Sequence, residues 1–309
     1  MNKLHTEVFG ITLKNPITVG SGTYGFGENY KEFYSPTELG AITVKGMTML
    51  PREGNSGTRG AETPGGMLNC VGLQNPGIDV FIKDYLPKLK NEGNIVFANI
   101  AGKDIEEFVE MAIKLENSQV DLIELNLSCP NVKEGGIAFG TSGEMVGLIT
   151  RKVKEVTGKP VVVKLTPNVT DIVSIAVAAE QNGADGLTLI NTLLGMAIDV
   201  DTGNPILGNV FGGLSGPAIK PVALKMVYQV YKHVKIPIIG MGGIVNERDA
   251  LEFFMAGASM IGVGTGNFID PMCPLKIKEG LERYLDIKGI GKITEIVGLA
   301  HRGGLTDGK

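Results

Sequence analysis

Polar side chains that can bind or react stand directly after several short apolar segments of the sequence. Lys45 and Lys164 each close such a segment, and Cys129 lies between two asparagines in Asn126–Asn131 (NLSCPN). A lysine can form a Schiff base with a carbonyl compound, or it can act as a fixed cation beside a group that becomes anionic. A thiol with polar neighbours can act as a base or as a nucleophile, although many cysteines are buried and inert. The residues by themselves leave both alternatives open.

Two glycine-containing pairs extend this set of strand-end residues. Gly242-Gly243 and Gly264-Thr265 follow the last two apolar segments. In barrels of parallel strands these loops commonly bind phosphate through backbone N–H groups and a helix N-terminus. One Gly-Gly pair is ordinary turn sequence, but two such pairs on adjacent strands favour a phosphorylated ligand. The other polar or glycine positions at segment ends are Ser21, Gly46, Asn99, Asn126, Asn131, Asn191 and Thr192.

The elements that must position these residues are eight short apolar runs, most of them apolar on both faces. They are Ile17–Ser21, Ala41–Lys45, Ile95–Ile100, Leu122–Leu127, Val161–Leu165, Gly186–Asn191, Ile238–Met241 and Met260–Val263. This pattern is typical of buried parallel strands, and the segments between them are long enough for crossover helices. Eight such units predict a closed (β/α)8 barrel with all the polar strand ends at one mouth. A doubly wound open sheet is the alternative, but it leaves the eighth strand and the polar ends without a common location.

Helix signals lie between the expected strands. Asp104 and Glu107 resemble a capping box ahead of an apolar face, and a second apolar stripe ends at Asn182-Gly183, where glycine can adopt the left-handed conformation. The stripes are Ile105, Phe108, Ala112 and Leu115, and Ile172, Ile175, Ala176 and Ala179. Residues 50–78 and 191–215 exceed what a minimal barrel needs, so we expect them to cover a substrate or to dock a partner on the C-terminal face.

Composition narrows the class of protein. The 309 residues carry 29 Lys and Arg against 33 Asp and Glu, a net charge of −4, which disfavours nucleic acid and anionic membranes as partners. Cys70, Cys129 and Cys273 form no Cys-x-x-Cys pair, so we expect neither disulfides nor a cysteine-ligated metal site, and Cys70 and Cys273 read as structural. With no signal-like or ~18-residue apolar run, the sequence predicts a cytoplasmic chain forming one domain over 1–309.

The chain resembles the class 1 dihydroorotate dehydrogenases, FMN-dependent (β/α)8 barrels of pyrimidine biosynthesis, along almost its whole length. The motifs that carry the resemblance are Asn15-Pro16-Ile17, Val44-Lys45-Gly46, Glu62–Gly77 (ETPGGMLNCVGLQNPG), Asn126–Asn131, Val163-Lys164-Leu165, Asn191-Thr192 and Gly240–Ile244 (GMGGI). The resemblance implies that FMN contacts Ser21, Lys45, Gly46, Asn99, Asn126, Lys164, Ile190, Gly216, Gly242, Gly243, Gly264 and Thr265. It implies that the substrate contacts Lys45, Asn69, Cys70, Val71, Gly72, Leu73, Asn126, Asn131, Asn191 and Thr192.

The resemblance also implies a mechanism. Cys129 is the general base that removes a proton from C5 of dihydroorotate while a hydride passes from C6 to the flavin, and orotate is the product. Lys164 stabilises the reduced flavin anion, and Lys45 can neutralise the substrate carboxylate. Asparagine amides suit the cyclic imide of this substrate because they offer both donors and acceptors.

The loop Glu62–Gly77 and the segment Ile238–Ile244 (IIGMGGI) are similar to the NAD-linked (type 1B) subgroup. In that subgroup a second protein carries FAD and a [2Fe–2S] cluster, and a heterotetramer is built on a dimer of FMN chains. The absence of a cluster-ligating cysteine pattern and of a dinucleotide fingerprint suits this division of labour. Three alternatives stay open: a fumarate-reducing homodimer, a lyase using Lys164 as a Schiff-base amine, and a non-enzymatic flavin-binding module. No amphipathic N-terminal segment supports a membrane quinone as acceptor.

Overall fold

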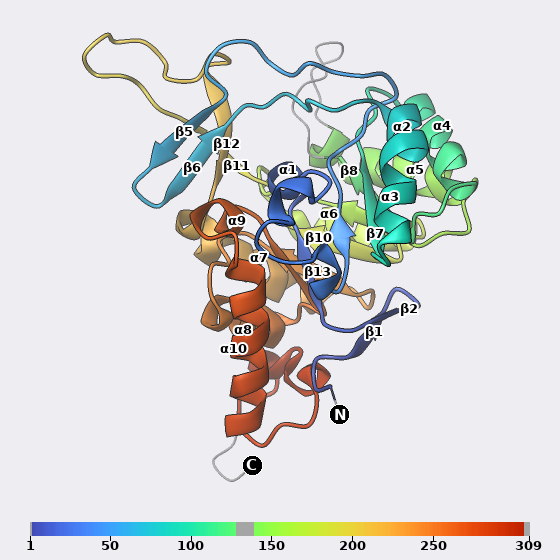
Figure 1. Cartoon of the computed structure of the whole chain (residues 1–309), viewed down its shortest axis with the longest axis vertical. Helices are drawn as coiled ribbons and strands as arrows, with labels where there is room; N and C mark the ends of the chain where they lie inside the picture. Colours follow the sequence, from blue (N-terminus) through green and yellow to red (C-terminus); the bar gives the residue numbers. More distant parts are fainter. Residues whose placement is uncertain (1, 128–138, 306–309) are drawn as a thin grey trace.

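A barrel of eight parallel strands forms the centre of the fold (Figure 1). The structure is a computed structural model that describes residues 2–127 and 139–305. Around the barrel the strands are β3 (Ile17–Val19), β14 (Met260–Val263), β13 (Ile238–Met241), β10 (Gly186–Leu189), β9 (Val161–Lys164), β8 (Leu122–Asn126), β7 (Val96–Ile100) and β4 (Ile42–Thr43). Each lies inside one of the eight expected segments, so the predicted (β/α)8 barrel is confirmed.

The two end strands of this series, β3 and β4, approach each other and bring the barrel close to closure. The backbone N–H of Gly40 donates to the Ile17 carbonyl at 3.0 Å. Inside the barrel, the hydroxyl oxygens of Thr18 and Thr43 lie 2.9 Å apart. A doubly wound sheet would leave these edges far apart, so that alternative is excluded.

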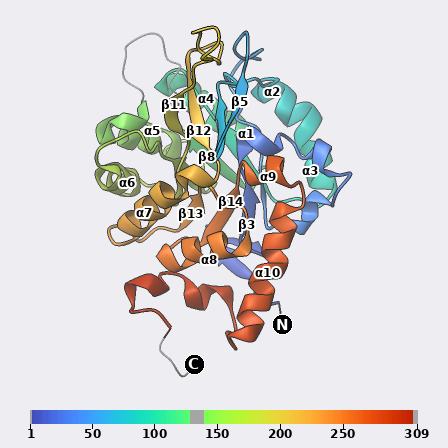
Figure 2. The same ribbon diagram turned by 90° about the vertical axis from the view of Figure 1, so that its left-hand side faces the viewer.

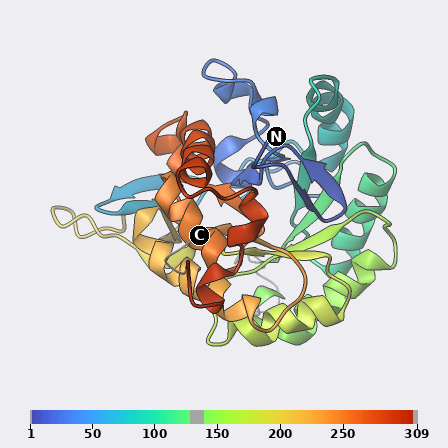
Figure 3. The same ribbon diagram turned by 90° about the horizontal axis from the view of Figure 1, so that it is seen from below.

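Helices cover the outside of the barrel, as the view from below shows (Figure 3). The longer ones are α4 (Ile105–Glu116), α5 (Gly143–Lys154), α6 (Ile172–Gln181), α7 (Lys220–Tyr231), α8 (Glu247–Ala256) and α10 (Cys273–Ile287), and the shorter ones are α1 (Ser21–Tyr24), α2 (Ile78–Val80), α3 (Leu86–Asn91) and α9 (Gly266–Ile269). Along the described chain, no helix is both long and apolar enough to cross a bilayer.

The helix ends follow the predicted signals with one difference. Asp104 caps α4 by accepting a hydrogen bond from the Glu107 N–H at 2.8 Å. The Glu107 carboxylate accepts from Lys103 N–H instead of from Asp104 N–H, so only half of the predicted capping box forms. At the far end of α6, Gly183 adopts a φ of +94°, as the Asn182-Gly183 signal predicted.

An antiparallel hairpin closes the N-terminal end of the barrel. Its strands are β1 (Thr6–Val8) and β2 (Ile11–Leu13). Val8 and Leu13 pack against a layer of inward-facing side chains made of Ala41, Phe97, Leu122, Val162, Ile239 and Met260. The barrel is therefore filled with apolar side chains at this end, which leaves the carboxyl ends of the strands as the place for a site.

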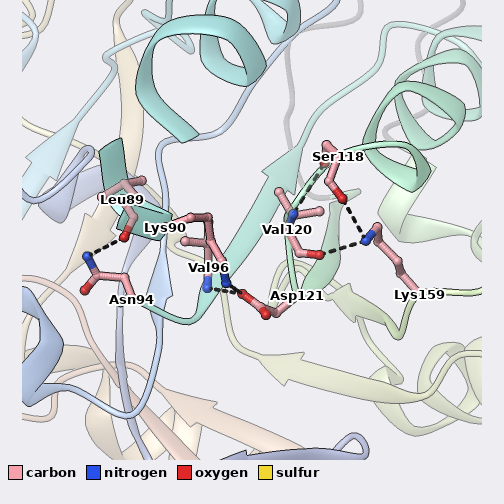
Figure 4. Close-up of polar contacts among 8 residues, drawn as sticks. All are labelled: Leu89, Lys90, Asn94, Val96, Ser118, Val120, Asp121 and Lys159. Atoms are coloured by element: carbon pink, nitrogen blue, oxygen red, sulfur yellow. Dashed lines mark hydrogen bonds and ion pairs between the residues drawn. The ribbon is translucent and has the colours of Figure 1, made fainter. Parts of the chain in front are cut away.

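Polar contacts hold the turns at the same closed end. Asp121 accepts a hydrogen bond from the Val96 N–H at 2.7 Å and forms an ion pair with Lys90 at 2.6 Å (Figure 4). Asp185 repeats both contacts between β9 and β10. Lys159 donates to two carbonyl oxygens of the turn before β8, at 2.9 and 3.1 Å (Figure 4). These charged groups therefore stabilise the turns at the closed end of the barrel. They lie far from the carboxyl ends of the strands.

The two long insertions meet in a second sheet, which we call the cap sheet. Its antiparallel strands, in spatial order, are β11 (Leu193–Met196), β12 (Phe211–Ser215), β6 (Gly66–Asn69) and β5 (Gly60–Thr63). Figure 2 shows β11, β12 and β5 standing beyond the carboxyl ends of the barrel strands. The position agrees with the prediction, but the sequence had indicated loops. The β12 segment FGGLS is rich in glycine, and its partner β6 lies about 145 residues away, so no local pattern reveals the pairing.

Candidate active site

Above the apolar layer, the strands direct polar side chains into the barrel. Asn99 on β7, Glu124 on β8 and Thr188 on β10 are each no more than 2% exposed. The Asn99 amide Nδ2 donates to Glu124 Oε1, and the Thr188 hydroxyl donates to Glu124 Oε2, both at 2.6 Å. Sequence reasoning missed Glu124 and Thr188, although an acidic residue inside the apolar run Leu122–Asn126 (LIELN) was a usable signal.

The Asn99 amide oxygen is buried and has no hydrogen-bond partner in the described parts of the chain. It lies against Gly46 at the carboxyl end of β4, where a Cβ atom would come within 2.6 Å of Asn99 Oδ1. A buried acceptor without a donor costs about 1–3 kcal/mol, and a ligand N–H group at this point would remove that cost. The carboxyl end of β4 therefore holds a buried acceptor that lacks a donor among the described residues.

Two lysines stand at the same mouth. Lys164 ends β9 and is 6% exposed, and Lys45 follows β4 and is partly buried. Burial lowers the pKa of the Lys45 amine below its ordinary value. Neither ammonium group has a carboxylate or other hydrogen-bond acceptor in range among the residues that the structure describes. Buried cations without a partner favour the binding of an anionic ligand.

The predicted amide residues gather beside Lys164. Asn126 pairs with Lys164 in the register of β8 and β9. The Asn191 amide Nδ2 donates to Asn126 Oδ1 at 3.3 Å, and Asn191 Oδ1 accepts from the Thr192 N–H at 2.7 Å. Three of the predicted substrate-binding residues are thus in one hydrogen-bonded group at the mouth.

The glycine loops after β13 and β14 expose backbone donors. Gly242 and Gly243 adopt φ values of +127° and +76°, which favour glycine. In the described chain, no acceptor is in hydrogen-bond range of the backbone N–H groups of Gly243, Gly264 and Thr265. A Cβ on Gly264 would meet no atom within 4 Å, so the space beside it is open. Free N–H groups around open space suit a phosphate.

Three further predicted cofactor residues surround these loops. Gly216 has a φ of +100°, and its carbonyl oxygen would lie 2.8 Å from a Cβ on Gly243. Ser21 is buried at the start of α1, and the Thr265 hydroxyl donates to Ser215 Oγ at 2.8 Å. Ile190 is 2% exposed and would lie 3.5 Å from a Cβ on Gly242.

The segment Asn69–Leu73 runs from the cap sheet to the mouth. The Asn69 amide donates to the Gly213 carbonyl at 3.2 Å, and Leu73 comes close to Gly46. The Val71 carbonyl accepts a hydrogen bond from the Asn55 N–H at 3.0 Å, and Gly72 has a φ of +77°.

The two described cysteines are buried, as the residue pattern predicted. The Cys70 thiol donates to the Thr58 carbonyl at 3.4 Å and packs with Leu68 and Leu207 inside the cap sheet. Cys273 is also buried, and burial raises its thiol pKa to about 12. Cys129 and Asn131 lie outside the described residues. Within the described ranges, no group of three His, Cys, Asp or Glu side chains is placed to hold a metal ion.

Fold and site together define a (β/α)8-barrel protein whose C-terminal mouth is built for an anionic ligand with hydrogen-bond donors. The family model described as dihydroorotate dehydrogenase matches residues 3–285. The chain belongs to the dihydroorotate dehydrogenase family, a family of oxidoreductases, and the resemblance seen in its motifs is confirmed.

Relatives of nearly the same length support this assignment. A protein of Thermoanaerobacter pseudethanolicus is 55% identical over 295 residues, which are 96% of this chain and 98% of that protein. One from Geobacillus kaustophilus is 55% identical over 306 residues, 98% of this chain and 97% of that protein. Another from Caldicellulosiruptor saccharolyticus is 53% identical over 295 residues, with coverages of 96% and 98%. All three are named dihydroorotate dehydrogenase B (NAD(+)), catalytic subunit.

Proposed function

We propose that this chain oxidises dihydroorotate to orotate in pyrimidine biosynthesis, as the FMN-binding subunit of an NAD-linked dihydroorotate dehydrogenase. The observation that carries the proposal is the pair of lysines at the barrel mouth, Lys45 and Lys164, neither of which has an anionic partner in the described chain. Dihydroorotate is an anionic carboxylate that would supply a negative charge for Lys45, and Lys164 would lie beside the flavin of FMN. The names of the relatives favour the same activity.

The described residues fit FMN in two respects. The unpartnered Asn99 oxygen suits an N–H donor of a flavin ring, and the open donors of Gly243, Gly264 and Thr265 suit its phosphate. The remaining residues that we propose for FMN are Ser21, Lys45, Gly46, Asn126, Lys164, Ile190, Gly216 and Gly242. When bound, FMN supplies the acceptor for the hydride that leaves C6 of the substrate.

The chain's own residues would bind the substrate and move its proton. Lys45 neutralises the substrate carboxylate, and the amides of Asn126 and Asn191 orient the cyclic imide. Cys129 accepts the proton from C5, and because a free thiol has a pKa of ~8.5, activity should rise with pH. Lys164 provides a positive charge in a site of low dielectric, where it stabilises developing negative charge most strongly.

We also propose that electrons leave through a second subunit with FAD and a [2Fe–2S] cluster, in a cytoplasmic heterotetramer built on a dimer of this chain. The relatives are named catalytic subunits, and this sequence has no cysteine pattern for a cluster. Seven large apolar side chains between residues 194 and 211 are more than a third exposed. Several large exposed apolar side chains in one segment favour a surface that another protein covers.

The first test is a visible absorption spectrum of the purified chain, followed by anaerobic addition of dihydroorotate. A flavin band that bleaches supports both the cofactor and the substrate. Reoxidation is then followed with fumarate, and separately with NAD and the FAD/[2Fe–2S] subunit, which distinguishes the two acceptors. A colourless folded protein, or a flavin band that dihydroorotate does not change, would refute the proposal. Borohydride trapping would then test Lys164 as a Schiff-base amine.

A further inference from the structure

The buried group of Asn99, Glu124 and Thr188 contains a carboxylate, and the binding of a cofactor by Asn99 does not by itself explain why a carboxylate lies there. Both oxygens of Glu124 accept hydrogen bonds, one from the Asn99 amide and one from the Thr188 hydroxyl, each at 2.6 Å. Asn99 and Glu124 are direct partners across β7 and β8. The Asn99 amide therefore turns its nitrogen toward Glu124 and its oxygen away from it.

The carboxylate of Glu124 does not serve to neutralise the nearby lysine. Lys164 is the strand partner of Thr188, but its ammonium is not within 4 Å of Glu124, and no other described cation pairs with this carboxylate. Burying a carboxylate without a counter-charge is costly, so its presence here calls for a role other than stabilising the fold. On the inner side of Asn99, the carboxylate provides a group that accepts hydrogen bonds and cannot donate them.

An acceptor on the inner side determines which end of the amide faces the mouth. An asparagine side chain carries one acceptor oxygen and one donor NH2 group at nearly equal positions, so it can turn over with little change in shape. Beside Glu124 only one orientation forms a hydrogen bond, and that orientation leaves Asn99 Oδ1 buried at Gly46, where no described residue donates to it.

We infer that Glu124 is a positioning residue that orients the Asn99 amide so that its oxygen accepts a hydrogen bond from an N–H group of the bound cofactor. The inference rests on the proposed binding of FMN. Glu124 acts only through Asn99, and the Thr188 hydroxyl completes the hydrogen bonding of the carboxylate.

The test compares Glu124→Gln with Thr188→Val, both close in shape to the native residues. In Glu124→Gln, the new amide forms two hydrogen bonds in either of two arrangements, because a hydroxyl both donates and accepts. In one arrangement it accepts from the Asn99 NH2 group and donates to Thr188, and in the other it donates to Asn99 Oδ1 and accepts from Thr188, with Asn99 turned over. This variant therefore no longer selects the orientation that presents Asn99 Oδ1 to the cofactor. In Thr188→Val, Glu124 remains an acceptor only, so the orientation of Asn99 is kept.

The measurements are the dissociation constant of FMN from each apoprotein, by quenching of FMN fluorescence, and the thermal midpoint of each apoprotein. We expect Thr188→Val to bind FMN like the wild type. We expect Glu124→Gln to bind FMN at least about twofold more weakly, because only the molecules with Asn99 in the native orientation are competent to bind.

Binding of FMN by Glu124→Gln as tight as by the wild type, or an equal loss of FMN affinity in both variants, would overturn the inference and assign Glu124 a structural role only. These results would leave the proposed function intact. A wild-type apoprotein that binds no FMN would overturn the proposed function and this inference together.

Discussion

Replacing Gly243 by alanine should destabilise the protein strongly, because the position combines a left-handed backbone with close packing. Its φ is +76°, a conformation that costs an alanine about 1–2 kcal/mol. A Cβ there would lie 2.8 Å from the Gly216 carbonyl oxygen and 2.9 Å from the Lys220 backbone nitrogen. Both atoms belong to the backbone, so they cannot move aside as the end of a flexible side chain can. We expect a total loss of about 3 kcal/mol.

Gly264→Ala is the matched control. It makes the same change in the neighbouring loop, at a glycine that is neither crowded nor left-handed. A Cβ at Gly264 would meet no atom within 4 Å, and its φ lies outside the left-handed region. The apoprotein should therefore keep its stability to within about 0.5 kcal/mol. If the open space holds the cofactor, the added methyl group should weaken FMN binding by about tenfold or more.

Thermal unfolding of the two apoproteins and FMN titration separate these effects. With an unfolding entropy of ~2.1 cal/mol/K per residue over 309 residues, 3 kcal/mol lowers the melting temperature by about 5 °C. An unchanged melting temperature for Gly243→Ala would refute the packing argument. A Gly264→Ala variant that binds FMN like the wild type would show that the open space is not part of the cofactor site.

Three further predictions concern single side chains. Cys129→Ala should lower turnover by ~10²–10⁴-fold while FMN stays bound, as expected for a lost general base, and the rise of activity with pH should disappear; unchanged turnover would remove Cys129 from the mechanism. Lys164→Met should slow the reduction of bound FMN by dihydroorotate by about 10²–10³-fold in anaerobic stopped-flow experiments, because the site loses its buried positive charge; reduction at the wild-type rate would contradict that role. Burial raises the pKa of Tyr24 to about 12, so the stability provided by its neutral form is complete below pH 10 and is lost as the pH rises toward 12. Because the Tyr24 hydroxyl is buried without a well-formed hydrogen bond to any described residue, Tyr24→Phe should cost less than about 0.5 kcal/mol at pH 7 and should be more stable than the wild type near pH 12 in urea titrations; equal curves at both pH values would show that Tyr24 titrates normally.

The sequence predicted the scaffold well because barrel strands are buried on both faces. Segments such as Val161–Leu165 and Met260–Val263 are apolar without alternation, and that pattern is local. Once eight such strands are assigned, the parallel barrel brings their carboxyl ends together. The sequence alone therefore places Lys45, Asn126 and Lys164 at one mouth.

Other features escaped prediction because they depend on residues far apart in the chain. The cap sheet pairs β6 with β12, and the β1–β2 hairpin fills the barrel end with Val8 and Leu13, although neither segment shows this role by itself. Glu124 lies within an apolar strand, and the local sequence pattern assigns it no role. Its role became apparent only from its hydrogen bonds to Asn99 on β7 and Thr188 on β10.

The sequence by itself determined the family, the barrel and the strand ends that carry polar groups. These features follow from periodicity and motifs, which are properties of residues close together in the chain. The tertiary structure decided which polar groups have partners. The lysines at the mouth lack anionic partners among the described residues, while Glu124 accepts from two donors and the buried amide oxygen of Asn99 has no partner among these residues. Hydrogen-bond satisfaction and burial are properties of side chains brought together from different strands, and no local pattern encodes them.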